Sequence, residues 1–124
     1  MEQKFYVCNV CGNLIIKLND SGLTPVCCGR DMVELEAAVT DGDIEKHVPV
    51  YSYAGNTVTV KVGATPHPMT PEHYIRWIFV NTDKGNHVYY LEPGDEPEVT
   101  FELSPSEHLE EVFEYCNIHK LWKA

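Results

Sequence analysis

The sequence has no long hydrophobic run and few basic residues. No stretch approaches the roughly 20 apolar residues that a membrane helix needs, and Met1-Glu2-Gln3-Lys4 lacks the layout of a signal peptide. We therefore expect a cytoplasmic protein without a membrane partner. Only 9 Lys and Arg residues oppose 19 Asp and Glu residues, so the formal net charge is −10. Phosphate binding needs clustered basic residues, and a nucleic-acid partner is therefore not expected.

The length and the hydrophobic content allow one ordinary core. A chain of 124 residues with 44% hydrophobic content can bury such a core and carry a small module beside it. Residues 1–37 hold four of the five cysteines and few large apolar residues, so we expect them to form a module that a metal holds together. Residues 38–124 should form the second domain, with 33–43 as a linker or joining strand.

Short alternating runs bounded by Pro, Gly, Asn and Asp indicate antiparallel β structure after residue 43. One run places Val58, Val60 and Val62 on one face, and another does the same for Ile75, Trp77 and Phe79. About six or seven short strands, with no internal repeat, predict a sandwich or barrel. The clearest runs span 44–53, 57–62, 73–81, 86–91 and 98–103, followed by a run that ends at Cys116.

The segment Glu107–Tyr115 is compatible with two structures. Its apolar residues Leu109, Val112 and Phe113 have the spacing of a helix. We favour a strand, because a sandwich of this length needs its last strand there.

Four cysteines lie in two pairs, each followed by glycine: Cys8-x-x-Cys11-Gly12 and Cys27-Cys28-Gly29. In a chain without an export signal, such cysteines favour metal ligation over disulfides. Four thiolates predict a tetrahedral site, which suits zinc and iron about equally. The adjacent pair Cys27-Cys28 is unusual for a zinc ribbon, whose second pair of ligands is normally separated.

The remaining cysteine and the histidines downstream offer a second set of ligands. A single histidine in such a protein is more often solvated or capping than a ligand. Here the local settings are stiff, because three prolines surround His67 and His73, and Pro49 follows His47 closely. Cys116 and His119 are spaced so that one turn can offer both to a single ion. The candidate ligands are therefore His47, His67, His73, Cys116 and His119.

Both patterns resemble those of known iron proteins. The two cysteine pairs, with fifteen residues between Cys11 and Cys27, resemble the desulforedoxin module, a relative of rubredoxin. Together with EKHVP (45–49), ATPHPM (64–69), His73 and EYCNIHKLW (114–122), they make the chain similar to the desulfoferrodoxin family of two-iron superoxide reductases. The resemblance covers nearly the whole chain, and no ligand position departs from it.

The resemblance implies a mostly β protein, with a desulforedoxin-like metal-knuckle module followed by an immunoglobulin-like antiparallel β-sandwich. It implies two iron ions per chain and the one-electron reduction of superoxide to hydrogen peroxide, a detoxification reaction. The first iron would be bound by Cys8, Cys11, Cys27 and Cys28. The catalytic iron would have His47, His67, His73 and His119 in a plane and Cys116 as axial ligand. His87 and His108 fall outside this pattern and are expected to be ordinary surface residues.

Two further residues gain roles from the resemblance. Lys46 would attract the superoxide anion and aid protonation, while Glu45 would supply a carboxylate to the oxidised iron. The family also implies a homodimer and an external electron donor, rubredoxin or a similar small redox protein. On this resemblance the first iron would either pass electrons to the second or only stabilise the dimer and its module, and the sequence does not separate these two roles. Family members without this module keep the same activity.

Two other classes of function compete with this hypothesis. One is a rubredoxin-like electron-transfer protein with the sandwich as a scaffold, which leaves Cys116 and the four histidines unexplained. The other is a zinc ribbon fused to an immunoglobulin-like binding module, which predicts a colourless protein without iron.

Overall fold

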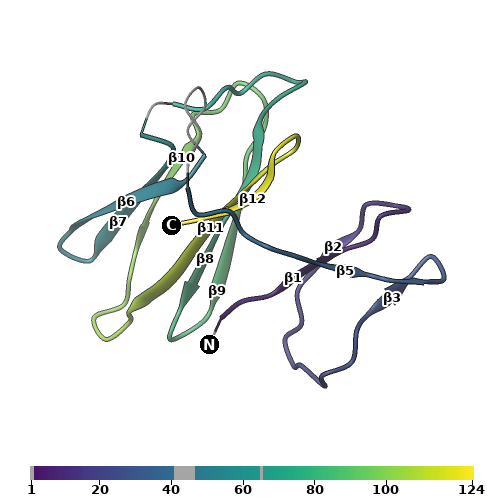
Figure 1. Cartoon of the computed structure of the whole chain (residues 1–124). Helices are drawn as coiled ribbons and strands as arrows, with labels where there is room; N and C mark the ends of the chain where they lie inside the picture. The colour runs from purple at the N-terminus through teal and green to yellow at the C-terminus, as the bar shows by residue number, and fades with distance from the viewer. Residues whose placement is uncertain (1, 41–46, 65) are drawn as a thin grey trace. The chain divides into compact units, whose positions relative to one another are not determined.

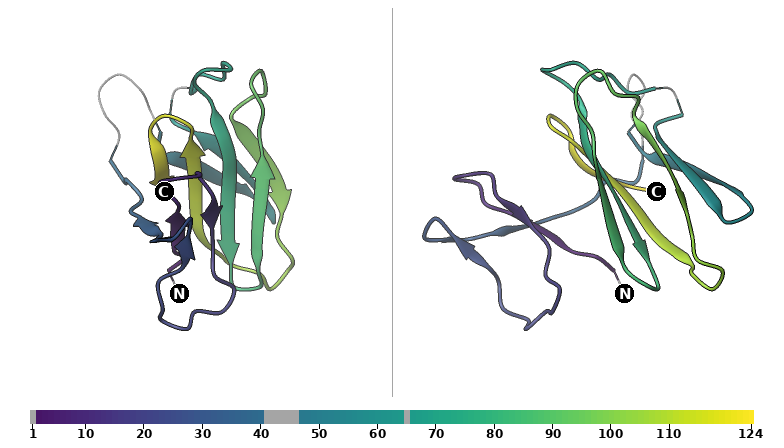
Figure 2. Two further views of the ribbon diagram at one scale, coloured as in Figure 1. Left: turned by 90° about the vertical axis from the view of Figure 1, so that its right-hand side faces the viewer. Right: turned by 180° about the vertical axis from the view of Figure 1, so that it is seen from behind.

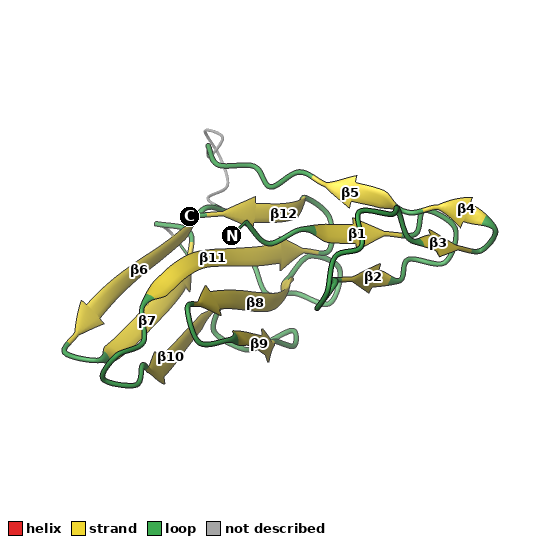
Figure 3. Ribbon diagram, turned by 90° about the horizontal axis from the view of Figure 1, so that it is seen from below, coloured by secondary structure: helices red, strands yellow, loops and turns green. Residues whose placement is uncertain are grey.

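The computed structural model describes residues 2–40, 47–64 and 66–124, and it consists of strands, turns and loops (Figures 1 and 3). The segment predicted as either strand or helix is a strand, β11 (Leu109–Cys116), which confirms the favoured alternative. Among the described residues, no helix is long and apolar enough to cross a membrane. The chain divides into two compact units, Met1–Glu36 and Ala37–Ala124.

The first unit contains two small sheets. Strands β1 (Phe5–Val7), β2 (Leu14–Ile15) and β5 (Val33–Leu35) form one sheet in the order β2-β1-β5. Strands β3 (Val26–Cys27) and β4 (Arg30–Asp31) form a hairpin. One buried cluster of this unit contains Tyr6, Cys8 and Met32, with Cys27 packed against them, and Phe5 of β1 is buried as well. So small a core supplies little stability of its own, as expected for a module that depends on a metal.

The second unit is a sandwich of two antiparallel sheets (Figure 2). The first sheet has the order β10-β7-β6, and the second has the order β12-β11-β8-β9. This arrangement confirms the predicted immunoglobulin-like sandwich. Its strands are β6 (Pro49–Ala54), β7 (Thr57–Val62), β8 (Ile75–Thr82), β9 (Asn86–Tyr90), β10 (Glu98–Glu102), β11 and β12 (Lys120–Lys123).

The core of the sandwich contains one of the candidate ligands. Apolar residues of β7, β8 and β11 meet between the sheets, and Cys116 is among them with 0% exposure. The alternation predicted for β7 is confirmed, because its three inward valines are almost fully buried. The buried cluster is Val58, Val60, Val62, Ile75, Ile78, Val80, Val112 and Cys116.

The alternation predicted for β8 is wrong at its start. Ile75 belongs to the cluster between the sheets, whereas Trp77 stacks on Tyr115 on the opposite face of its sheet. The cause is a shift in register between Tyr115 and Cys116, after which Cys116 lies opposite Ile75. Such an irregularity changes the face to which the following side chains point.

Candidate metal centres

The structure brings together the five predicted ligands of the second centre. One ligand atom from each of the five residues lies within 4.8 Å of the others. They meet at one end of the sandwich, because β7 and β11 end there and β6, β8 and β12 begin there. Cys116 is the last residue of β11, and the four histidines lie in the adjoining loops and turns. The ligands are His47, His67, His73, Cys116 and His119.

The four imidazole rings form a square. Neighbouring ring centroids around it are 4.6, 4.7, 5.1 and 4.7 Å apart, in the order His47, His67, His73, His119 and back to His47. The centroids of His47 and His73 are 6.5 Å apart, as expected for the diagonal of such a square. The Cys116 Sγ lies 3.7 Å from His67 Nε2 and 3.9 Å from His119 Nδ1. The arrangement therefore offers four nitrogens and one sulfur to a single ion.

The hydrogen bonds fit a cation in this square. His47 Nε2 is 3.0 Å from His67 Nε2 and 3.1 Å from His119 Nδ1. His67 Nδ1 is 2.7 Å from the carbonyl oxygen of Pro68, which assigns its proton to Nδ1 and leaves a lone pair on Nε2. A neutral imidazole has only one N–H, so ring nitrogens that converge in this way are best satisfied by a metal ion.

Burial differs between the ligands of the second centre. Cys116 is fully buried, and His47 and His67 are 3% and 4% exposed. His73 is half-buried and His119 is exposed. The His119 side of this group is therefore more exposed to solvent than the His47 and His67 side, while the Cys116 thiol lies in the apolar core.

The structure also brings together the four cysteines of the first centre. Their sulfur atoms lie within 4.8 Å of one another, and all four are free thiols. The Sγ atoms of Cys11 and Cys27 are 3.6 Å apart, and those of Cys27 and Cys28 are 3.9 Å apart. Both distances far exceed a disulfide bond of about 2.05 Å. Cys28 has φ 55° and the following Gly29 has φ 72°, so the second pair lies on a tight left-handed turn.

The electrostatics of these thiols also fit a metal. Backbone N–H groups of Cys11 and Val10 lower the pKa of Cys8 to about 6. Hydrogen bonding with the thiols of Cys11 and Cys8 raises the pKa of Cys28 to about 12. The thiol of Cys11 likewise raises the pKa of Cys27. One thiol thus ionises readily, and the resulting thiolate disfavours ionisation of the next thiol. A bound cation removes this repulsion between thiolates.

Four further residues considered from the sequence are not among the candidate ligands. Glu45 and Lys46 are outside the described residues, and His47 is the first described residue after them. The side chain of His108 is 79% exposed and its Nδ1 lies 2.9 Å from Asp83 Oδ2. The side chain of His87 is 50% exposed. Neither belongs to a group of possible metal ligands among the described residues.

Two residues near the second centre were missed from the sequence. The indole of Trp122 stacks on His47, and its Nε1 donates to the carbonyl oxygen of His119 at 3.1 Å. Asn117, between two ligands in the sequence, binds the backbone on both sides of His73. Both residues lie in the motif EYCNIHKLW, but alternation and spacing gave them no role.

Comparison with known proteins covers both units. The family model "Desulfoferrodoxin" matches residues 39–124, and "Desulfoferrodoxin, N-terminal domain" matches residues 1–35. A desulfoferrodoxin homolog of Archaeoglobus fulgidus is 44% identical over 119 residues, which cover 96% of this chain and 94% of that protein. A superoxide reductase of Pyrococcus horikoshii is 34% identical over 108 residues, with 72% and 94% covered.

Solved structures agree with these relatives. The crystal structure of the superoxide reductase from Treponema pallidum matches with a TM-score of 0.84 and 33% identity. The match covers 99% of this chain and 98% of that one, so it includes both units. On the family models and the near full-length identity, the chain belongs to the desulfoferrodoxin family.

Proposed function

We propose that the protein is a superoxide reductase, an oxidoreductase that reduces superoxide by one electron to hydrogen peroxide. The observation that carries the proposal is the square of four imidazoles with the buried thiol of Cys116 beside it. Relatives of 34% and 33% identity are named superoxide reductases. A zinc-binding scaffold or a simple electron carrier would not require this second group of ligands.

Iron suits both sets of ligands. The second iron would be held by the four histidines and Cys116, and the first by Cys8, Cys11, Cys27 and Cys28. When bound at the second centre, iron would supply one electron for the reduction of superoxide, which with two protons gives hydrogen peroxide, and an external donor would have to restore that electron. The thiolate of Cys116 would increase electron density at the metal, and its burial excludes water from the sulfur.

The residues before His47 would act on the substrate. Lys46 would provide a positive charge beside the centre in a protein of net charge −10, attracting the superoxide anion and aiding protonation. Glu45 would supply a carboxylate that favours the oxidised state, whose iron has one more positive charge. Both roles rest on the adjacency of these residues to His47 in the sequence and on the motif EKHVP.

The first centre and the assembly complete the proposal. Residues 1–37 would form the module with the first iron, and 38–124 the catalytic domain. Cys11 and Cys28 are exposed, so a small redox protein such as rubredoxin could approach this centre. The chain would act as a cytoplasmic homodimer. Exposed apolar side chains of the first unit, including Leu18 at 86% and Leu23 at 75%, offer area for a second copy.

The stoichiometry of superoxide consumption tests the proposed function. The reduced, iron-loaded chain should form one hydrogen peroxide for each superoxide consumed and release no dioxygen. A dismutase forms half as much peroxide and releases dioxygen, and a simple electron carrier lacks a fast reaction with superoxide. The variant His73→Ala should lose the reaction, whereas His87→Ala should retain it, because His87 is not among the ligands. Equal activity of both variants would exclude the second centre as the site of reaction.

A further inference from the structure

The pairing of β8 and β11 becomes irregular at the end of the two strands next to His73 and Cys116. The two strands pair in register from Glu111 opposite Asn81 to Tyr115 opposite Trp77, and the register then shifts before Cys116. His73 precedes β8 by two residues and Cys116 ends β11. Regular sheet pairing therefore does not by itself set the position of one ligand relative to the other.

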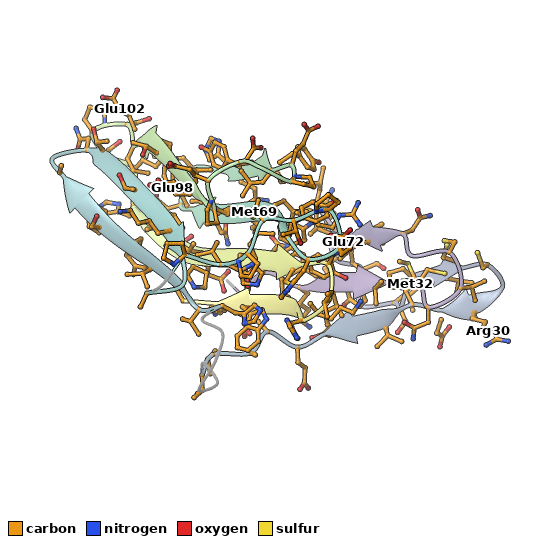
Figure 4. All side chains as sticks on the ribbon, turned by 90° about the horizontal axis from the view of Figure 1, so that it is seen from above. Arg30, Met32, Met69, Glu72, Glu98 and Glu102 are labelled. Carbon is orange, nitrogen blue, oxygen red and sulfur yellow. The ribbon has the colours of Figure 1, made fainter. Side chains whose placement is uncertain are left out.

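Asn117 extends the pairing beyond this irregularity. Its backbone N–H donates to the carbonyl oxygen of Tyr74 at 3.2 Å. Its side-chain Oδ1 accepts from the backbone N–H of Tyr74 at 2.9 Å, and its Nδ2 donates to the carbonyl oxygen of Glu72 at 3.0 Å. An amide side chain offers the donor and the acceptor of a peptide group. Asn117 thus binds the chain immediately before and immediately after His73, in the loop where Figure 4 labels Glu72.

The backbone of His73 itself is held from the other side of the same loop. Its N–H donates to the carbonyl oxygen of Thr70 at 3.1 Å, and its carbonyl oxygen accepts from the Thr70 N–H at 3.0 Å. These contacts fix the shape of the turn, but Thr70 is only three residues away. The contacts of Asn117 cross 43 and 45 residues of sequence, so they relate the turn to the strand end that carries Cys116.

We propose that Asn117 is a positioning residue, which sets ligand His73 relative to ligand Cys116 in the second centre. The inference rests on the proposed function, because it takes both residues as ligands of one metal. Ligand positions in such sites are fixed to within about 0.2 Å, and residues that orient ligands typically change metal affinity about 10- to 100-fold when replaced. Asn117 orients the peptide backbone of the ligand rather than its ring.

A matched control separates positioning from general stability. Asn81 also connects β8 to β11, since its Nδ2 donates to Glu111 Oε1 at 3.0 Å. It lies opposite Glu111, near the other end of the two strands from Cys116. Asn81→Ala therefore removes an asparagine hydrogen bond from the same pair of strands without touching the loop of His73.

The experiment titrates the metal-free full-length chain with Co(II), whose absorption bands distinguish a four-thiolate centre from a histidine-rich one. Asn117→Ala should weaken Co(II) binding at the second centre about 10- to 100-fold and leave the first centre unchanged. Asn117→Asp keeps an acceptor for the Tyr74 N–H but loses the donor to Glu72. Its Co(II) affinity at the second centre should therefore lie between those of Asn117→Ala and wild type. Asn81→Ala should lower the melting temperature and leave Co(II) affinity unchanged.

The midpoint reduction potential of iron at the second centre is an independent measurement of the same effect. Asn117→Ala should shift it, whereas Asn81→Ala should not. Unchanged Co(II) affinity and potential in folded Asn117→Ala, or an equal loss in Asn81→Ala, would overturn the inference. If Asn117→Ala does not fold, Asn117→Asp decides in the same way. Absence of a Cys116 thiolate band in wild type would instead count against the proposed function.

Discussion

The indole of Trp122 lies parallel to the imidazole of His47, with ring centroids 4.5 Å apart and planes 13° from parallel. The same indole donates from Nε1 to the carbonyl oxygen of His119 at 3.1 Å. Trp122 thus holds the ring of one candidate ligand and the backbone of another. Its own strand position is fixed by Ala38, whose N–H and carbonyl oxygen bond to the residues on either side of Trp122.

Replacing Trp122 should perturb the second centre in two steps. Trp122→Phe keeps a stacking ring but removes the donor to His119, so a small spectral shift is expected. Trp122→Ala removes both contacts and should lower the free energy of unfolding by about 2 kcal/mol, less than for a fully buried tryptophan. Absorption spectra and urea unfolding measure the two effects. A normal spectrum of the second centre in Trp122→Ala would restrict the residue to a packing role.

The two metal centres should be lost independently. Cys116→Ser should remove the absorption of the second centre and the reaction with superoxide, while the first centre keeps its bands. Cys28→Ser should do the converse, because the two ligand groups share no residue and belong to different units. Metal analysis should find one iron per chain in each variant. Loss of both irons on removal of Cys28 would mean that the units depend on each other.

Alternation in the sequence predicted most of the sandwich. Strand β7 has the predicted bounds, and β9 and β10 each differ from prediction by one residue at the end. The strand β12 was missed, because four residues with two lysines give too short a pattern. It forms through pairing with β11 and through the bonds of Ala38, which are contacts distant in sequence.

The sequence identified the residues that meet at the second centre more completely than their surroundings. Residue type, nearby prolines and the resemblance were sufficient to select the five residues that the structure brings together there. The square of imidazoles could not be derived, because it depends on where strands of both sheets end. The contacts of Asn117 were missed for a related reason, since they compensate for a register shift that alternation does not reveal.

Removing the positive charge of Lys46 should slow the reaction with superoxide. Lys46→Ala is expected to reduce the rate about tenfold at low salt and to flatten its dependence on ionic strength, because a screened attraction is lost. Pulse radiolysis at several salt concentrations measures both. Lys84→Ala is the control, since Lys84 follows β8 at the end away from the ligands. An unchanged salt dependence in Lys46→Ala would mean that Lys46 is an ordinary solvated residue with no role in attracting superoxide.

Glu45→Ala provides the contrasting variant at the same motif. It should alter the spectrum of the oxidised second centre and the pH dependence of that spectrum. The rate of the reduced protein with superoxide should stay close to that of wild type, because the role proposed for Glu45 concerns the oxidised state. A large loss of that rate would instead give Glu45 a role in the reduced centre.

Two carboxylates should make the sandwich less stable in acid. The backbone N–H of His108 lowers the pKa of Asp83, and the hydroxyl of Thr82 lowers the pKa of Glu107. A pKa that is lower in the folded state adds stability above the unfolded value, and this stability is lost as the pH falls through the folded value. The free energy of unfolding should therefore decrease as the pH is lowered below about 4.

Variants at these positions isolate this effect from protonation of the metal ligands. Asp83→Asn and Glu107→Gln should be less stable than wild type at pH 7, and the difference should shrink as the pH falls. Urea unfolding between neutral pH and about pH 3 measures it. Glu110→Gln, at an exposed position of β11, serves as the control. A difference from wild type that stays constant with pH would show that these carboxylates act only by packing.

The backbone of Lys120 should limit stability at the turn that carries Cys116 and His119. Lys120 has φ 70°, a left-handed conformation that costs a side chain of ordinary type about 1 kcal/mol more than glycine. Lys120→Gly should therefore leave the free energy of unfolding unchanged or raise it slightly. Lys120→Val, with a β-branched side chain, should have a free energy of unfolding about 2 kcal/mol lower than that of the glycine variant. Urea unfolding of the full-length chain measures this order, and Lys61→Gly in regular strand β7 should instead be destabilising. A loss in Lys120→Gly as large as in Lys61→Gly would show that the turn gains nothing from glycine.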